Sequence, residues 1–119
     1  MATNTFKRVT KANISSASGS PTTLYTVPSG KTSIIIGCLI TNKTTSPATI
    51  NVQIDTSITA QDDVFITSGL NVPPNSGVEI AMGKVVLTHD SSNGDIVKAY
   101  GSASATFDIT LSVLEDVNT

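Results

Sequence analysis

Apolar and polar residues alternate along several stretches of this chain, which is the pattern of β-strands that bury one face. Between residues 106 and 114 the odd positions are apolar, and the even positions are polar until Leu114. Residues 48–55 alternate in the same way. Because successive side chains of a strand point to opposite faces, each stretch predicts a strand with one apolar face.

The run at residues 33–41 is apolar on both faces. A continuous run of this length predicts a central strand that is covered on both sides. Gly37 lies within the run and predicts a bulge or a close approach of another backbone. Cys38 is expected to act there as a small buried hydrophobe.

Shorter apolar segments, separated by Gly, Pro and Asn, complete the pattern. The double proline at 73–74 excludes a helix or a central strand at that point. Tight turns are expected at 82–83 and 93–94. Further strands are expected at 23–27, 64–66, 77–81, 84–88 and 95–100, with at most one short strand near 6–14, and the strand at 64–66 is expected to cross between sheets.

About eight short strands at a spacing near ten residues predict an all-β fold, an antiparallel β-sandwich of the jelly-roll-like kind without significant helix. Stacking two such sheets predicts an aliphatic core, since aromatic residues are only 4% of the chain. The expected core members are Leu24, Ile35, Ile50, Val52, Ile54, Phe65, Ile80, Val85, Leu87, Val97, Phe107, Ile109, Leu111 and Val113.

Composition supports strands and a single domain. The chain has 119 residues, of which 13% are charged, while 18 are Thr and 15 are Ser. Thr is β-branched and suits a half-exposed strand, whereas good helix formers for an exposed face are scarce. We interpret residues 1–20 as a basic N-terminal arm with a flexible link, and residues 21–119 as a single β-sandwich domain.

The charge is uneven along the chain. Lys7, Arg8 and Lys11 fall in the first 11 residues without an acid among them, although the whole chain has a net charge of −2. Phe6, Lys7, Arg8 and Lys11 are therefore candidate contacts to a protein partner, and the alternative is a frayed terminus with ordinary solubilising charge. Three cations are too few for nucleic-acid binding, and the rest of the chain is acidic.

Secretion and membrane insertion are not indicated. The first residues lack the apolar stretch of a signal peptide, and the longest apolar run is far shorter than a membrane span. The single cysteine, Cys38, excludes an internal disulfide. We therefore expect a soluble protein that is made in a reducing cytoplasm, with no membrane partner.

Candidate chemistry is sparse. His89, Asp90 and Ser91 are the side chains of a hydrolase triad, but such partners normally come from separated segments, so a turn is the better interpretation. The tripeptide at 30–32, Gly-Lys-Thr, matches the end of a phosphate-binding loop motif, but the earlier glycine of that motif is absent. Calcium remains a minor alternative, for which the oxygen ligands would come from Asp55, Asp62, Asp63, Asp90 and Asp95. We predict a protein that is not an enzyme and has no cofactor or metal.

Five segments resemble a family of small virion structural proteins of tailed bacteriophages, especially contractile-tailed phages of marine cyanobacteria. They are residues 1–8, 24–37, 63–66, 72–84 and 108–115. The resemblance implies a non-enzymatic part of the virion, made in the host bacterial cytoplasm. It implies a capsid decoration or cement protein, or a neck, tail or baseplate component.

The resemblance also implies partners. These would be other virion proteins, such as major capsid or tail and neck subunits, with the chain present as a homo-oligomer or in symmetric copies. It carries over no catalytic or metal residue. The alternative function is a carbohydrate- or surface-binding β-sandwich module, for which Tyr25 and Tyr100 are the tyrosines that could stack on a sugar ring.

Overall fold

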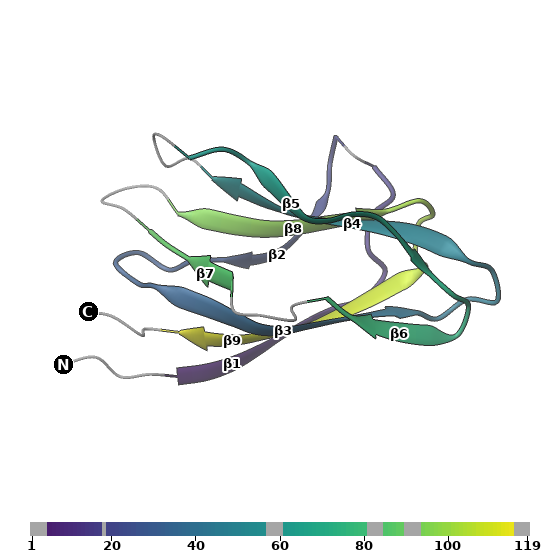
Figure 1. Cartoon of the computed structure of the whole chain (residues 1–119), viewed down its shortest axis with the longest axis horizontal. Helices are drawn as coiled ribbons and strands as arrows, with labels where there is room; N and C mark the ends of the chain where they lie inside the picture. The colour runs from purple at the N-terminus through teal and green to yellow at the C-terminus, as the bar shows by residue number, and fades with distance from the viewer. Residues whose placement is uncertain (1–4, 18, 57–60, 81–84, 90–93, 116–119) are drawn as a thin grey trace.

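Nine β-strands form two antiparallel sheets in the computed structural model (Figure 1), which describes residues 5–17, 19–56, 61–80, 85–89 and 94–115. No helix is present among these described residues. The all-β sandwich prediction is therefore confirmed. The strands are β1 (Thr5–Lys11), β2 (Thr22–Thr26), β3 (Ser33–Asn42), β4 (Ala48–Thr56), β5 (Val64–Val72), β6 (Ser76–Glu79), β7 (Val85–Leu87), β8 (Asp95–Gly101) and β9 (Phe107–Glu115).

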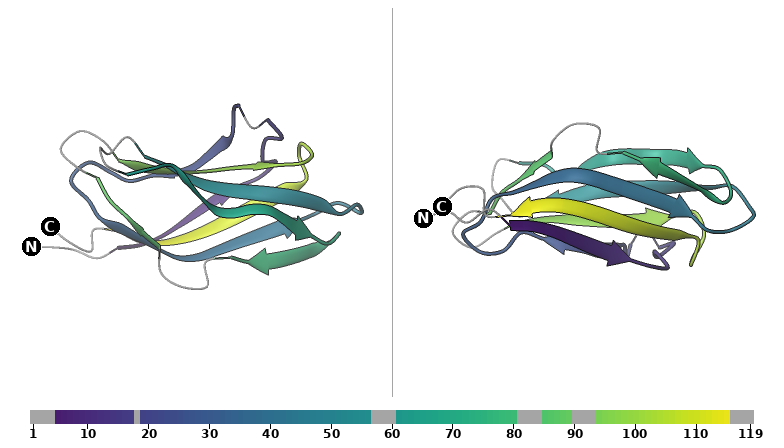
Figure 2. Two further views of the ribbon diagram at one scale, coloured as in Figure 1. Left: turned by 45° about the horizontal axis from the view of Figure 1, so that its top comes forward. Right: turned by 90° about the horizontal axis from the view of Figure 1, so that it is seen from below.

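The strand order is that of a hairpin rolled into two layers. Sheet A has the order β1-β9-β3-β6, with β7 also paired to β3, and sheet B has the order β2-β8-β4-β5. The pairs β1–β9, β2–β8, β3–β6 and β4–β5 nest inside one another along the chain. Such a nested set, alternating between two stacked sheets, is a jelly-roll-like arrangement, and Figure 2 shows the two layers from two further directions.

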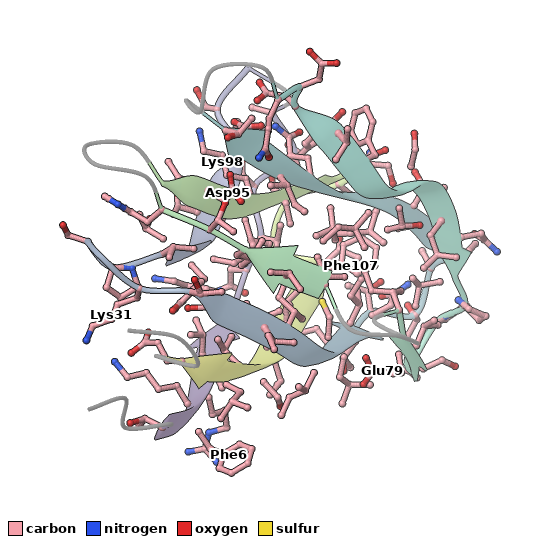
Figure 3. The ribbon with its side chains drawn as sticks, turned by 60° about the vertical axis from the view of Figure 1, so that its left-hand side comes forward. Phe6, Lys31, Glu79, Asp95, Lys98 and Phe107 are labelled. Atoms are coloured by element: carbon pink, nitrogen blue, oxygen red, sulfur yellow. The ribbon has the colours of Figure 1, made fainter. Side chains whose placement is uncertain are left out.

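The core lies between the sheets and is aliphatic except for two aromatic rings. Phe107 is the largest fully buried side chain and points into the space between the sheets (Figure 3). Of the expected core, Leu24, Ile35, Ile50, Val52, Leu87, Val97, Phe107, Ile109, Leu111 and Val113 are buried, while Ile54, Ile80 and Val85 are partly buried against them. Burial of these side chains is the main stabilising term of the fold.

Phe65 is a correction to the expected core, because its side chain is 52% exposed. The pairing of β4 with β5 shifts register twice, on either side of Val52, and Phe65 comes to lie opposite Gln53. Each irregular step changes which face a residue occupies. The strand at this position also extends to Val72 and stays in sheet B, so the expectation that it crosses between sheets is wrong.

The N-terminal segment belongs to the sandwich in this structure. Strand β1 pairs with β9 along its full length, and Ile14 is 0% exposed in the core. The N–H of Ile14 donates to the carbonyl of Phe107 over 3.1 Å. The described part of this segment therefore supplies both a sheet edge and a core side chain, and the division into a basic N-terminal arm over 1–20 and a domain over 21–119 stays a prediction.

The bulge expected at Gly37 is present. The register of β3 against β9 shifts between Ile35 and Gly37, and the Cys38 N–H released there donates to the Glu79 carboxylate over 2.5 Å. Cys38 is 1% exposed, as expected of a small buried hydrophobe. The turn expected at 82–83 lies outside the described residues, as does the first residue of the turn expected at 93–94.

Candidate protein-docking surface

Strand β1 exposes all four residues that the sequence indicates as partner contacts. Phe6, Lys7, Arg8 and Lys11 are exposed, and Phe6 retains 76% of its accessible surface. Their strand is terminal in sheet A, so no strand among the described residues pairs with its outer edge. Such an edge can pair with another chain, and charged side chains are a common device for restricting which chain does so.

A buried polar cluster holds the start of β1 in place. Glu115 is 7% exposed, and its carboxylate accepts a short hydrogen bond from the Tyr25 hydroxyl and lies 3.1 Å from the Lys7 ammonium. The same hydroxyl lies 2.8 Å from the Ser33 hydroxyl. Burial, and then the hydrogen bond to Glu115, raise the pKa of Tyr25 well above its ordinary value, so the phenol stays protonated as a donor. The cluster joins β2 of sheet B to β1, β3 and β9 of sheet A.

Four apolar residues form a row across the outer face of sheet A. Phe6 lies opposite Leu114, Leu114 opposite Ile34, and Ile34 opposite Val86. Direct cross-strand partners point to the same side of a sheet, so the row is continuous from β1 to β7. Val86 is 56% exposed at the far end of the row.

Two further side chains extend this row along β3. Ile36 is 40% exposed and Leu39 is 43% exposed, both beside the bulge. We call the six residues the apolar outer patch: Phe6, Ile34, Ile36, Leu39, Val86 and Leu114. Scattered exposed apolar residues are ordinary on a protein, but a gathered group of this kind marks an interaction surface. No single stretch of sequence reveals it, because it depends on the register of four strands.

The opposite side of the sandwich carries a shallow acidic hollow at the start of β5. It has a volume of about 90 Å³ and is lined by Gln53, Asp55, Asp63, Val64 and Phe65. We call these five residues the acidic hollow. Val64 is 51% exposed and Phe65 is 52% exposed.

Hydrogen bonds and one ion pair fix the polar walls of the acidic hollow. Asp55 lies 3.0 Å from the Lys98 ammonium and accepts a hydrogen bond of 2.5 Å from the Gln53 amide. Asp63 accepts from the backbone N–H of Thr56 over 2.7 Å. The hollow therefore combines two carboxylates with the exposed apolar side chains of Val64 and Phe65.

Catalytic and metal-binding arrangements gain no support from the described geometry. His89 Nδ1 and Asp95 Oδ1 are buried without a hydrogen-bond partner among the described residues, and Asp90 and Ser91 lie outside them. In the part of the chain that the structure describes, no three His, Cys, Asp or Glu side chains gather so that they could hold a metal ion. The segment 28–32 is a turn, in which the Lys31 N–H donates to the Pro28 carbonyl.

The two tyrosines proposed for sugar stacking are not equally placed. Tyr25 is 8% exposed and lies within the buried cluster, so its ring cannot stack on a ligand in this structure. Tyr100 is half-buried on β8, opposite Asn51 on β4. Of these two rings, only that of Tyr100 remains available to the carbohydrate alternative.

Neither a search of protein-family models nor a search of curated proteins found a match to this chain. Among the described residues there is also no helix that is long and apolar enough to cross a membrane.

Proposed function

We propose that this chain is a structural subunit of a bacteriophage particle that docks on a neighbouring virion protein through the apolar outer patch. The observation that carries the proposal is the unbroken row from Phe6 to Val86 on the outer face of sheet A. Only 13% of the residues are charged, so few charges are available to keep such an exposed apolar row solvated. An apolar row of this kind is typical of a surface that another protein covers. The resemblance of five sequence segments to virion structural proteins supplies the setting.

The chemistry of the patch suits a permanent protein contact. Aliphatic and aromatic side chains on a flat sheet bury well against another apolar surface, and they contribute the core of obligate interfaces. A place in the capsid decoration or in the neck, tail or baseplate would each provide such a covering neighbour. Strand β7 pairs with the start of β3, where Ser33 belongs to the buried cluster, so the cluster supports this end of the patch from beneath.

The test is incorporation into particles. Purified virions are analysed by mass spectrometry for the wild-type chain and for a double variant, Leu39→Ser with Val86→Ser. Truncation of a residue that carries binding energy at an interface costs over about 1 kcal/mol, so loss of two such residues should reduce incorporation about tenfold or more. Thr23→Ala, on the outer face of sheet B, is the control and should be incorporated normally. Absence of the wild-type chain from virions refutes the proposal.

The alternative of a carbohydrate-binding module makes a different prediction. It requires glycan binding that is lost when Tyr100 is replaced by alanine, with the folded structure retained. It also leaves the apolar outer patch without a role, which is why we favour the structural subunit. Glycan binding by the wild-type chain, together with normal incorporation of the double variant, would favour the alternative.

A further inference from the structure

The two terminal strands β1 and β5 carry opposite charge on opposite sides of the molecule. Strand β1 is the terminal strand of sheet A and β5 is the terminal strand of sheet B, and the two lie on opposite sides of the molecule in Figure 1. Beside the exposed Phe6, β1 bears the cations Lys7, Arg8 and Lys11. The start of β5 bears the acidic hollow, with Asp62 exposed next to it.

We propose that copies of this chain associate head-to-tail, with β1 of one copy lying along β5 of the next. The inference rests on the proposed function, because a subunit of a particle is present in several copies. We infer that one neighbour of each copy is a second copy of the same chain. In the part of the chain that the structure describes, each of the two strands has one edge with no partner in its sheet, and such edges pair readily with a strand of another chain.

Charge decides between this contact and a symmetric one. Two β1 strands that met antiparallel around a two-fold axis would bring the cations of both copies together, and like charges directly opposite one another destabilise a sheet. A β1 strand that meets the acidic hollow instead brings Arg8 toward Asp62 and Asp63. The electrostatics therefore favour the head-to-tail contact.

One antiparallel register matches the side chains of both edges. If Phe6 lies opposite Phe65, then Arg8 falls opposite Asp63, two positions further along β1 and two positions back from Phe65. Phe6 and Arg8 share one face of their strand by alternation, and Phe65 and Asp63 line the same hollow. On one face of the joined strands, this register places the exposed ring of Phe6 against that of Phe65, and Arg8 against the carboxylate of Asp63. Figure 3 shows Phe6 projecting away from the sandwich, where it can reach a neighbour.

A mixing experiment separates the head-to-tail contact from the symmetric one. The purified wild-type chain should form oligomers in light scattering and sedimentation at concentrations up to about 1 mM, the range of weak specific contacts. Phe6→Ser removes the β1 side of the contact in every copy, and Phe65→Ser removes the β5 side. Each variant alone should be monomeric, because neither has a complementary pair of surfaces. Their equimolar mixture should form a one-to-one dimer, because one intact side of each kind remains.

Controls fix the cause of any loss. Thr45→Ala changes an exposed side chain in the loop between β3 and β4, outside both β1 and β5, and should leave the oligomer unchanged. Asp63→Asn keeps an acceptor for the Thr56 N–H but removes the negative charge, so it should weaken the association about fivefold. Salt at 0.5 M should weaken the wild-type association by a similar factor, because it screens the same charges. Arg8→Glu, which changes only an exposed side chain, should also give monomers if Phe6→Ser proves difficult to fold.

Several outcomes would overturn the proposal. A wild-type chain that stays monomeric at 1 mM, a Phe65→Ser variant that dimerises by itself, or a mixture that stays monomeric each contradicts it. Glycan binding that is lost in Phe65→Ser would assign the acidic hollow to a saccharide instead. If the chain does not form oligomers but the Leu39→Ser, Val86→Ser double variant is excluded from virions, only the head-to-tail proposal is refuted. If the chain forms oligomers but is absent from virions, only the proposed function is refuted.

Discussion

Replacing Ile14 with alanine tests whether the N-terminal segment is structurally part of the sandwich. Ile14 is 0% exposed, and its backbone N–H is bonded to the carbonyl of Phe107 over 3.1 Å, which fixes the side chain between the sheets. The substitution removes three carbon atoms, and roughly 0.8 kcal/mol for each buried carbon gives a loss near 2.4 kcal/mol from transfer alone. With the residual cavity, substitutions of this kind cost about 2–5 kcal/mol.

Equilibrium unfolding in urea measures this loss. With a slope of about 1–3 kcal/mol per molar urea, the midpoint should fall by about 1–3 M without a change in slope. Thr10→Ala, an exposed position on β1 in the same N-terminal segment, is the control and should stay within about 0.5 kcal/mol of the wild type. If Ile14→Ala is as stable as Thr10→Ala, then Ile14 is not packed in the core and residues 5–17 form a detachable arm.

Two further predictions concern the core and the buried thiol. A Cβ at Gly101 would lie 2.7 Å from Cδ2 of Phe107, so Gly101→Ala should lower the free energy of unfolding by about 1–3 kcal/mol in thermal or urea unfolding. Gly19→Ala is the control and should be neutral, because a Cβ at Gly19 would have nothing within 4 Å. Equal stability of the two variants would contradict the close contact at Gly101. Burial, with a smaller contribution from Glu79, raises the pKa of the Cys38 thiol from 9.0 to about 12, so a disulfide reagent at pH 8 should label Cys38 only after unfolding. Because the thiol of the unfolded chain ionises at lower pH, the contribution of Cys38 to the free energy of unfolding is complete below pH 9 and declines as the pH rises toward 12. Cys38→Ala should flatten that decline. Labelling of the native chain as fast as the unfolded chain would show that Cys38 is accessible to the reagent.

The sequence predicts the fold where one residue pattern determines one outcome. The strict alternation of 107–113 specifies a strand with one buried face, and Phe107, Ile109, Leu111 and Val113 are all buried. The bulge at Gly37 was also predictable, since a glycine within a strand weakens regular pairing there. These signals are local, so they need no knowledge of the neighbouring strands.

The errors arise where pairing between strands decides the outcome. Phe65 has an apolar side chain within a strand, but the register shifts between β4 and β5 turn it to the outer face. Ile14 stands alone among polar residues, so no period marks it as a core residue, although it is fully buried. Val72 precedes two prolines and still closes the core, because β5 is an edge strand where proline can follow without loss of a ladder bond.

The candidate surfaces show the same division. The cations Lys7, Arg8 and Lys11 could be named from the sequence, because their clustering is visible along the chain. The apolar outer patch could not, since Ile34 and Val86 lie far apart in sequence and meet only in the register of β3 with β7. The acidic hollow likewise depends on the meeting of β4 and β5.

The nested pairing of the strands has a consequence for how the chain folds. The innermost pair, β4 with β5, joins neighbouring segments, whereas the outermost joins Thr5 to Glu115, across almost the whole chain. Closing long loops costs entropy before the contacts that reward it can form, and folds dominated by distant pairings fold in about milliseconds to seconds. During synthesis, sheet A therefore cannot close until β9 has left the ribosome. Until then β1 and β3 lack their common partner β9, so premature association of nascent chains is a hazard.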